Sequence, residues 1–262
     1  HEGIPAESIL CGNGAADLIF RLAWAAKPRT ALVTAPTFAE YAAALESAGC
    51  AVRRHFLQAE VDFAVTDSIL SSITPEVDMV FLCQPSNPTG QLTPLPLVER
   101  ILRRCEACGA LLVVDECFLD FLPDCDALTA KALLGSKNLL ILKAFTKLYG
   151  MAGVRLGYCL CANTALLGAM QAAGQPWAVS SLAQAAGLAA LDETAYVAQV
   201  RALIAQQRPR LTAGLRALGL RVLDGRANYL LFQGPETLGD ALWQRGVVPV
   251  SYTHLRAHET SL

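Results

Sequence analysis

The 262-residue sequence has few charged residues and no long apolar segment. Charged residues make up 17% of it and hydrophobic residues 53%. No run reaches the roughly 18 consecutive apolar residues that a membrane-spanning helix needs. It also has no block of basic residues, and its formal net charge is −2. These absences argue against nucleic acids and membrane surfaces as partners.

The cysteines give no sign of a metal site or of a disulfide framework. The nine cysteines are scattered, and the single C-x-x-C, Cys105 to Cys108, has no second pair at zinc spacing. Cys105 also falls on the apolar stripe of a predicted helix. We therefore expect reduced, structural thiols, no metal site and a cytoplasmic location.

Lysine is scarce as well, and one of the five lysines is placed for chemistry. Lys147 lies between an apolar run, residues 139–142, that predicts a buried strand and a segment with three glycines and Arg155. A neutral lysine amine can form an imine with an aldehyde cofactor, which requires burial or nearby positive charge to lower its pKa. Thr146 and Arg155 are placed to hold a phosphate beside it. The alternative is that Lys147 is an ordinary solvated charge.

A second candidate anion site lies near the start of the chain. A short apolar run, residues 8–11, leads into a Gly-Asn-Gly turn, and a helix is predicted from Ala15 to Ala26. Free backbone N–H groups at a helix start attract negative charge. The turn is not the dinucleotide fingerprint, because Asp17 occupies the position of its third glycine. A plain turn before a helix is the alternative.

The middle of the chain alternates predicted strands and helices, and a notable side chain follows each of three strands. Strands are predicted at 30–34, 52–57, 80–83 and 111–114, and helices from 36 to about 48 and from 95 to 108. Strand, helix and strand at this spacing favour parallel pairing. Phe38, Asn87 and Asp115 come just past strand ends, at the edge where parallel sheets bind ligands. Taken singly, Phe38 is equally explained as a core aromatic, and Asp115 as a helix cap or salt bridge.

These features converge on one cofactor. A single crevice would contain a phosphate cradle, an aromatic ring, an amide donor, a carboxylate and an amine. Pyridoxal phosphate needs this set, because the amine holds its aldehyde, the carboxylate keeps its ring nitrogen protonated, and the ring then accepts electrons. The candidate cofactor-binding residues are Gly12, Asn13, Gly14, Ala15, Phe38, Asn87, Asp115, Thr146, Lys147 and Arg155.

Four motifs carry a resemblance to a known family. S-N-P-T-G at 86–90, V-V-D-E at 113–116, F-T-K at 145–147 and G-V-R-L-G-Y at 153–158 resemble those of fold-type I pyridoxal phosphate enzymes, in the class I/II aminotransferase superfamily. The resemblance covers about residues 5–250.

The resemblance implies a role for each candidate residue. Lys147 would be the imine lysine and the catalytic residue, and Asp115 would pair with the pyridine nitrogen. Asn87 would bond the ring hydroxyl and Phe38 would stack on the ring. The amides of Gly14 and Ala15, with Thr146 and Arg155, would hold the phosphate.

The resemblance also implies an α/β fold in two parts. We expect a three-layer αβα large domain with a mostly parallel sheet over residues 1–195, lacking its N-terminal part. A truncated α/β small domain would follow over residues 196–250, and residues 251–262 look like a non-native tail. Helices are predicted at 178–190 and from 195 to about 218, and strands at 158–161, 227–232 and 247–250. A homodimer is expected.

Two branches of the superfamily compete, the threonine-phosphate decarboxylases and the histidinol-phosphate aminotransferases. Both imply a small phosphorylated substrate. The segments 36–41, 115–121, 175–179 and 225–231 resemble the decarboxylases more closely. Phe118 is the discriminating residue, because many aminotransferases of this kind carry a tyrosine there that bonds the ring hydroxyl. A catalytically silent domain that binds a phosphorylated ligand is the alternative outside enzymes.

The sequence departs from the family pattern at several points. Ala144 stands where Ser or Thr is usual, which removes one hydroxyl from the phosphate site, and Lys143 replaces a common arginine. We expect the chain to be a fragment that lacks the N-terminal segment and the arginine gripping the substrate carboxylate. Such a fragment is predicted to bind substrate poorly.

Overall fold

A seven-stranded sheet forms the centre of the protein. The computed structural model describes residues 2–250. The strands, in the order β1-β7-β6-β5-β4-β2-β3, are β1 (Ile9–Gly12), β7 (Gly157–Cys161), β6 (Leu139–Ala144), β5 (Leu111–Asp115), β4 (Met79–Cys83), β2 (Thr30–Ala35) and β3 (Ala51–Phe56). The five strands from β6 to β3 are parallel, whereas β7 runs antiparallel to both of its neighbours. The predicted mostly parallel sheet is confirmed.

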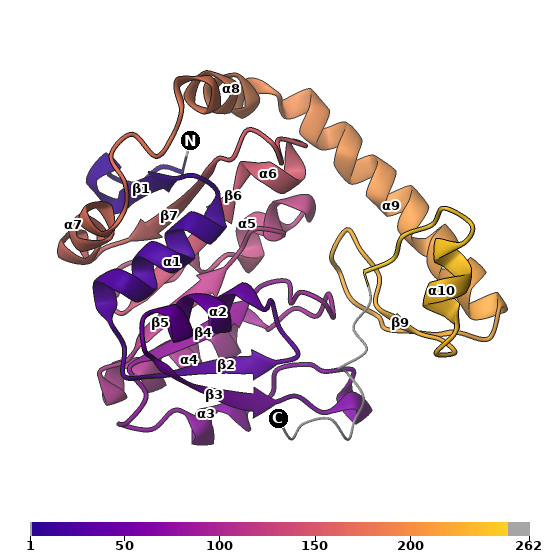
Figure 1. Ribbon diagram of the computed structural model, residues 1–262, viewed down its shortest axis with the longest axis horizontal. Coiled ribbons are helices and arrows are strands. Elements are labelled where there is room, and N and C mark those ends of the chain that lie inside the picture. The colour runs from indigo at the N-terminus through magenta and orange to yellow at the C-terminus, as the bar shows by residue number, and fades with distance from the viewer. Residues whose placement is uncertain (1, 251–262) are drawn as a thin grey trace.

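Helices cover both faces of this sheet (Figure 1). One apolar core lies between the sheet and α1 (Ala15–Ala26), α2 (Glu40–Ser47) and α7 (Thr164–Ala173). A second lies between the other face and α3 (Ile69–Ser72) and α4 (Leu95–Cys108). Strand β4 contributes Met79 and Phe81 to the first core and Val80 and Leu82 to the second. This alternation along a strand with two covered faces produces the expected three layers.

The two best-defined helices follow their sequence signals. Helix α1 begins after Gly14, and its buried residues include Leu18, Ile19 and Leu22 on one face. Helix α4 ends at Gly109, whose φ of 72° lies in the left-handed region that favours glycine at a helix C-terminus. Both ranges match the prediction, whereas α7 was not predicted.

The chain then leaves the sheet along two helices. Helix α8 (Ser181–Asp192) is followed by the long α9 (Thr194–Ala217). Figure 1 shows α9 running from α8 toward β9 and α10. This last group consists of β8 (Arg221–Val222), β9 (Phe232–Gln233) and α10 (Leu238–Trp243). The proposed domain division at residues 195 and 196 stays a prediction.

Two strand predictions in this last group were wrong. Instead of a strand over residues 227–232, only Phe232–Gln233 forms β9, because Arg208 takes the carbonyl groups of Gly225, Ala227 and Tyr229. The segment 247–250 forms no strand. The N–H of its first residue, Val247, donates to the Leu242 carbonyl in α10 rather than to a strand. Pro249 has no N–H to donate. The predicted non-native tail, residues 251–262, lies outside the described residues.

Within residues 2–250, no helix combines the length and the apolar character that crossing a membrane requires.

Candidate active site

The ends of four strands meet at one edge of the sheet. Gly12 of β1 pairs with Gly157 of β7, which in turn pairs with Ala144 of β6. Because β7 is antiparallel to both neighbours, β1 and β6 run in the same direction and end together. Asp115, the last residue of β5, pairs with Cys83, the last residue of β4. The segments that follow these strands therefore begin at the same edge of the sheet, as the sequence predicted.

A pocket lies at this edge, with about 560 Å³ of space that includes the part open to solvent. Seven of the ten candidate residues line it, namely Ala15, Phe38, Asn87, Asp115, Thr146, Lys147 and Arg155. Gly12, Asn13 and Gly14 form the turn beside it. Five further lining residues had no place in the sequence argument, namely Ala16, Ile19, Tyr41, Cys83 and Cys117, and the wall is completed by Phe118 and Ala144. Tyr41 follows Phe38 by three residues, a spacing that gave only a weak signal.

The turn before α1 is tightly packed. The N–H of Asn13 donates to Asp17 Oδ2 at 2.9 Å, and the N–H of Gly14 donates to the Gly12 carbonyl at 2.8 Å. Those two amides therefore already have acceptors, and Ala15, the first residue of α1, is the part of the turn that lines the pocket. A Cβ on Gly157 would lie 2.5 Å from the Ala15 nitrogen, so only glycine allows this approach.

Arg155 lies against this turn. A Cβ on Gly14 would lie 2.8 Å from Arg155 Nη2, which places the guanidinium directly beside the start of α1. Arg155 Nη1 donates to the Ala152 carbonyl at 3.0 Å. The arginine has a φ of 63°, and Thr146 lies buried on the same pocket wall. A cation, a hydroxyl and a helix N-terminus together are suited to an anion.

Asp115 is held by two neutral donors. Its side chain is buried at 6% exposure. Tyr41 donates its hydroxyl to Asp115 Oδ2 at 2.6 Å, and the Cys117 N–H donates to Oδ1 at 3.0 Å. Among residues 2–250, Asp115 makes no ion pair, so the salt-bridge alternative does not apply to it. The pocket therefore contains a buried carboxylate without a cationic partner.

Lys147 lies on the one-turn helix α6 (Phe145–Leu148), directly after β6. Its side chain is exposed and lines the pocket. Its Nζ lies 5.4 Å from the centre of the Phe118 ring. Within the described part of the chain it forms no ion pair. An aromatic face holds the ammonium group weakly and leaves it available.

The loop that carries Asn87 is fixed at both ends. The Gln84 side chain exchanges two hydrogen bonds with the backbone of Thr93, at 2.7 and 2.8 Å. The N–H of Asn87 donates to Cys83 Sγ at 3.3 Å. From the far end of the chain, Tyr229 donates its hydroxyl to the Ser86 carbonyl at 2.8 Å. The ring of Tyr229 also meets the Phe118 ring edge-on, with 5.1 Å between the centroids.

A second group of charges lies beside the pocket without lining it. Lys143, 5% exposed, places its Nζ 2.8 Å from Asp120 Oδ1 and 3.8 Å from Glu116 Oε2. Burial alone would lower the pKa of Lys143, but the charges of Asp120 and Glu116 outweigh it and raise that pKa. Burial raises the pKa of Glu116 to about 7 against the opposing effect of Lys143. We call Glu116, Asp120 and Lys143 the ion cluster.

All nine cysteines are free thiols. The C-x-x-C places Cys105 in the core and Cys108 partly exposed. Over residues 2–250, no three potential metal ligands gather in one place. The cytoplasmic location stays a prediction.

Comparisons with known proteins found a family model and several relatives that match most of the chain. A family model described as aminotransferase class I and II matches residues 3–260. Over 89% of its length, the chain is 38% identical to threonine-phosphate decarboxylase of Salmonella typhimurium, covering 64% of that protein. It is 37% identical to histidinol-phosphate aminotransferase of Desulfitobacterium hafniense, again over 89% of this chain and 65% of the relative. The chain thus spans about two thirds of these relatives.

A solved structure of a histidinol-phosphate aminotransferase has a similar fold. The crystal structure of the histidinol-phosphate aminotransferase from Clostridium acetobutylicum superposes with a TM-score of 0.85 at 26% identity. The match covers 92% of this chain and 73% of that one.

Proposed function

Because the chain belongs to the aminotransferase class I and II family, whose cofactor is pyridoxal phosphate, we propose that the protein decarboxylates L-threonine O-3-phosphate. The product would be (R)-1-aminopropan-2-yl phosphate, an intermediate suited to cobalamin synthesis. The proposal has two parts, the placement of the cofactor in the pocket and the choice of reaction, and each rests on different residues.

The pocket residues fit the cofactor. Arg155 and the start of α1 supply positive charge at one end, where Gly157 lets the Gly14–Ala15 backbone pack closely against β7. Asp115 supplies a buried carboxylate without a counter-ion, suited to a protonated ring nitrogen. Lys147 supplies an amine, and Phe38 an aromatic face. When bound, the cofactor supplies a ring that accepts the electron pair of a bond broken at the substrate Cα.

Each residue of the chain then has a stated task. Lys147 would bind the cofactor aldehyde and, once released, carry a proton to or from the substrate carbon. Asp115 would hold the proton on the ring nitrogen, and Asn87 would hydrogen-bond the ring hydroxyl. Thr146, Arg155 and the Ala15 amide would bind the phosphate. Ala144 offers a methyl group at this wall, so no hydroxyl comes from that position.

Phe118 is the observation that carries the choice of decarboxylation. It lines the pocket next to Lys147, at the position where the resemblance puts a tyrosine in many aminotransferases. The hydroxyl of Tyr41, which lines the pocket, donates to Asp115, and that of Tyr229, whose ring contacts Phe118, donates to the Ser86 carbonyl. Asn87 would therefore be the side chain that bonds the ring hydroxyl, as the resemblance implies for the decarboxylases.

Histidinol-phosphate transamination is the second candidate. The 37% identity to the Desulfitobacterium hafniense aminotransferase is close to the 38% found for the Salmonella typhimurium decarboxylase. Both candidates use the same cofactor and a phosphorylated substrate. They differ in which bond at the substrate Cα breaks and in whether 2-oxoglutarate is needed.

The test uses the purified protein at its full gene-encoded length, loaded with pyridoxal phosphate. It is given L-threonine O-3-phosphate alone, and separately histidinol phosphate with 2-oxoglutarate, and CO2 and glutamate are measured. We expect CO2 without glutamate from the first mixture. Glutamate from the second mixture would replace the proposal by transamination. Phosphate-ligand binding without either product and without a cofactor absorption band would indicate a silent binding domain.

We also propose that the protein is a homodimer. Large apolar side chains are exposed on one stretch, with Trp177 at 95%, Leu182 at 70% and Leu188 at 70% exposure. Covering such side chains favours association. Sedimentation of the loaded protein should give twice the chain mass, and Trp177→Ser should shift the equilibrium toward the monomer, whereas a native monomer at micromolar concentration would contradict the proposal.

A further inference from the structure

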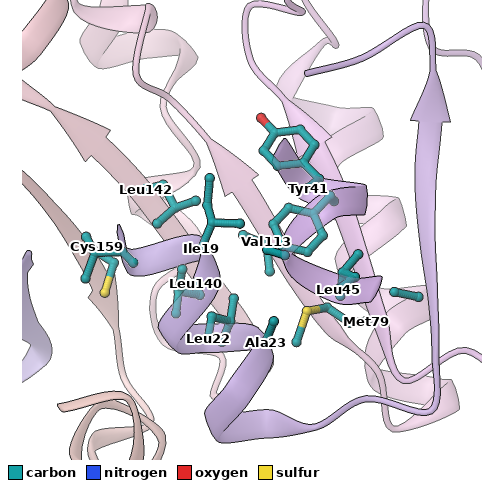
Figure 2. Close-up of a cluster of buried hydrophobic side chains, with 14 of the residues drawn as sticks. Ile19, Leu22, Ala23, Tyr41, Leu45, Met79, Val113, Leu140, Leu142 and Cys159 are labelled. Atoms are coloured by element: carbon teal, nitrogen blue, oxygen red, sulfur yellow. The ribbon is translucent and has the colours of Figure 1, made fainter. Parts of the chain in front are cut away.

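Among the described residues, Tyr41 is the one tyrosine that lines the pocket. Its ring stacks on Phe81 of β4, with 4.7 Å between centroids and 22° between planes. It is completely buried and belongs to the core between the sheet and α1. Figure 2 shows the ring at the edge of this cluster, with the hydroxyl oxygen pointing away from the apolar side chains. The ring position is therefore set by core packing.

The hydroxyl of Tyr41 meets Asp115 at 2.6 Å. Burial, reinforced by the charge of Asp115, raises the pKa of Tyr41 well above its ordinary value, so the hydroxyl keeps its proton and remains a donor. A carboxylate has about four lone-pair sites, and Tyr41 and the Cys117 N–H use two of them. The remaining sites are open to a donor in the pocket.

The same side chain also supports Phe38. The Phe38 ring meets the Tyr41 ring edge-on, with 5.5 Å between centroids and 83° between planes. This is a preferred geometry for an aromatic pair. One side chain therefore contacts both the carboxylate at one end of the pocket and the aromatic ring proposed to lie on the cofactor face.

We propose that Tyr41 is a positioning residue that fixes two cofactor contacts at once: its hydroxyl orients the Asp115 carboxylate and its ring sets the plane of Phe38. The inference rests on the part of the proposed function that puts pyridoxal phosphate in this pocket, and not on the choice of reaction. Tyr41 acts through Asp115 and Phe38 and need not touch the substrate.

The first test is Tyr41→Phe, which keeps the stacked ring and removes the hydroxyl. The matched control is Tyr158→Phe, which removes a hydroxyl that also donates to a carboxylate, that of Glu2, outside the pocket. Binding of pyridoxal phosphate and the pH midpoint of its absorption band are measured for native protein and both variants. The other titratable side chains lining the pocket are Cys83, Asp115, Cys117, Lys147 and Arg155, and all remain in place.

We expect Tyr41→Phe to weaken cofactor binding about tenfold, as loss of a hydrogen bond to a charged group does. The pH midpoint should move by roughly 0.5–1 unit, because the carboxylate no longer holds the ring proton as firmly. Tyr158→Phe should change neither. Native affinity and an unmoved midpoint in Tyr41→Phe would overturn the inference.

Two further variants separate the two roles. Phe38→Leu should weaken binding without moving the pH midpoint, because it leaves Tyr41 and Asp115 intact. Tyr41→Phe combined with Asp115→Asn should behave as Asp115→Asn alone, because the hydroxyl acts through that carboxylate. Neither Asp115→Asn nor the double variant leaves an unpaired carboxylate. These two can therefore be compared even if Tyr41→Phe alone does not fold. Additive effects would overturn the inference.

The outcome is distinguishable from failure of the proposed function. A native protein that binds the cofactor but acts on neither phosphorylated substrate would overturn the reaction and leave Tyr41 in its role. A native protein that takes up no pyridoxal phosphate would overturn both.

Discussion

Two regions meet at the end of β6, and they use the same residue types differently. In the pocket, Lys147 and Asp115 have aromatic and hydroxyl neighbours. In the ion cluster, Lys143 and Glu116 have each other and Asp120. Successive strand residues point to opposite faces, so Ala144 lines the pocket whereas Lys143 does not. A lysine with two carboxylates contributes to stability, while a lysine held only by a ring stays available for chemistry.

Replacing either of the two lysines gives the largest expected effects. Loss of Lys143 should lower stability, whereas loss of Lys147 should lower activity. Lys143→Met leaves two carboxylates beside an apolar side chain, and we expect the free energy of unfolding to fall by about 3–5 kcal/mol. Lys147→Ala removes an exposed side chain, and we expect a change within about 0.5 kcal/mol. Urea denaturation of both variants measures this difference.

In activity the order of the two variants should be reversed, so that Lys147→Ala loses more than Lys143→Met. Without the Lys147 amine, the cofactor absorption band should lose its lysine-bound form, and turnover should fall on the order of 10³-fold or more. Lys143→Met, assayed below its melting temperature, should retain the band. The contrast between the pocket and the ion cluster would be contradicted if Lys147→Ala kept the band or if Lys143→Met were as stable as native protein.

The pH dependence of stability should reveal the ion cluster. The pKa of Glu116 is about 7 in the folded protein against 4.5 as the ordinary value, so the folded chain holds an extra proton between those values. The free energy of unfolding should therefore fall as pH rises from about 4.5 to 7, by up to about 3 kcal/mol, and level off above. Glu116→Gln should lack this decline.

Exposed Glu60 offers the control for that experiment. Glu60→Gln should retain the decline seen in native protein, because its carboxyl is solvated in both states. A Glu116→Gln variant with the native pH profile would show that the cluster holds Glu116 ionised throughout this range.

A glycine pair tests the packing of the pocket turn. In Gly157→Ala, the new Cβ would lie 2.5 Å from the Ala15 nitrogen, so the turn must move. We expect about tenfold weaker binding of pyridoxal phosphate, with strain of roughly 1–3 kcal/mol. Gly153→Ala is the control, since no atom lies within 4 Å of its Cβ. Equal cofactor affinity in the two variants would show that the turn does not hold the phosphate.

Much of the site was predictable because parallel sheets collect their strand ends. Phe38, Asn87, Asp115 and Lys147 each follow a short apolar run, and once the strands are parallel these positions must share an edge. The length of the runs and the glycines between them were enough to place the strands that these four residues follow. No distance between side chains was needed for that prediction.

The rest depended on contacts between distant residues. Tyr41 and Asp115 are 74 positions apart, and no local pattern pairs them. The aromatic face under Lys147 comes from Phe118, which itself packs against Tyr229. The strand predicted at 227–232 looked correct by composition, but a guanidinium from α9 takes the carbonyl groups that a ladder would use. Local alternation cannot report such competition.

The smallest expected effect on cofactor affinity comes from that guanidinium, the side chain of Arg208. Arg208 donates to the carbonyl groups of Ala227 at 2.7 Å and Tyr229 at 2.6 Å, and also to that of Gly225. These contacts shape the segment 225–229, whose Tyr229 meets both the Asn87 loop and Phe118. Arg208→Ala should cost about 2 kcal/mol, because water replaces part of the lost bonding. Exposed Arg210 gives the control variant Arg210→Ala.

Hydrogen exchange separates a local effect of Arg208 from a global one. Amides of residues 225–229 should exchange faster in Arg208→Ala, whereas those of β5 and β6 should keep their native protection. Cofactor affinity should fall by no more than about threefold, since the hydrogen bonds that hold Asp115 come from Tyr41 and Cys117, outside this segment. A larger loss of affinity would mean that the late segment supports the pocket as directly as the strand ends do. Helix α9 would then support the pocket as well, through Arg208.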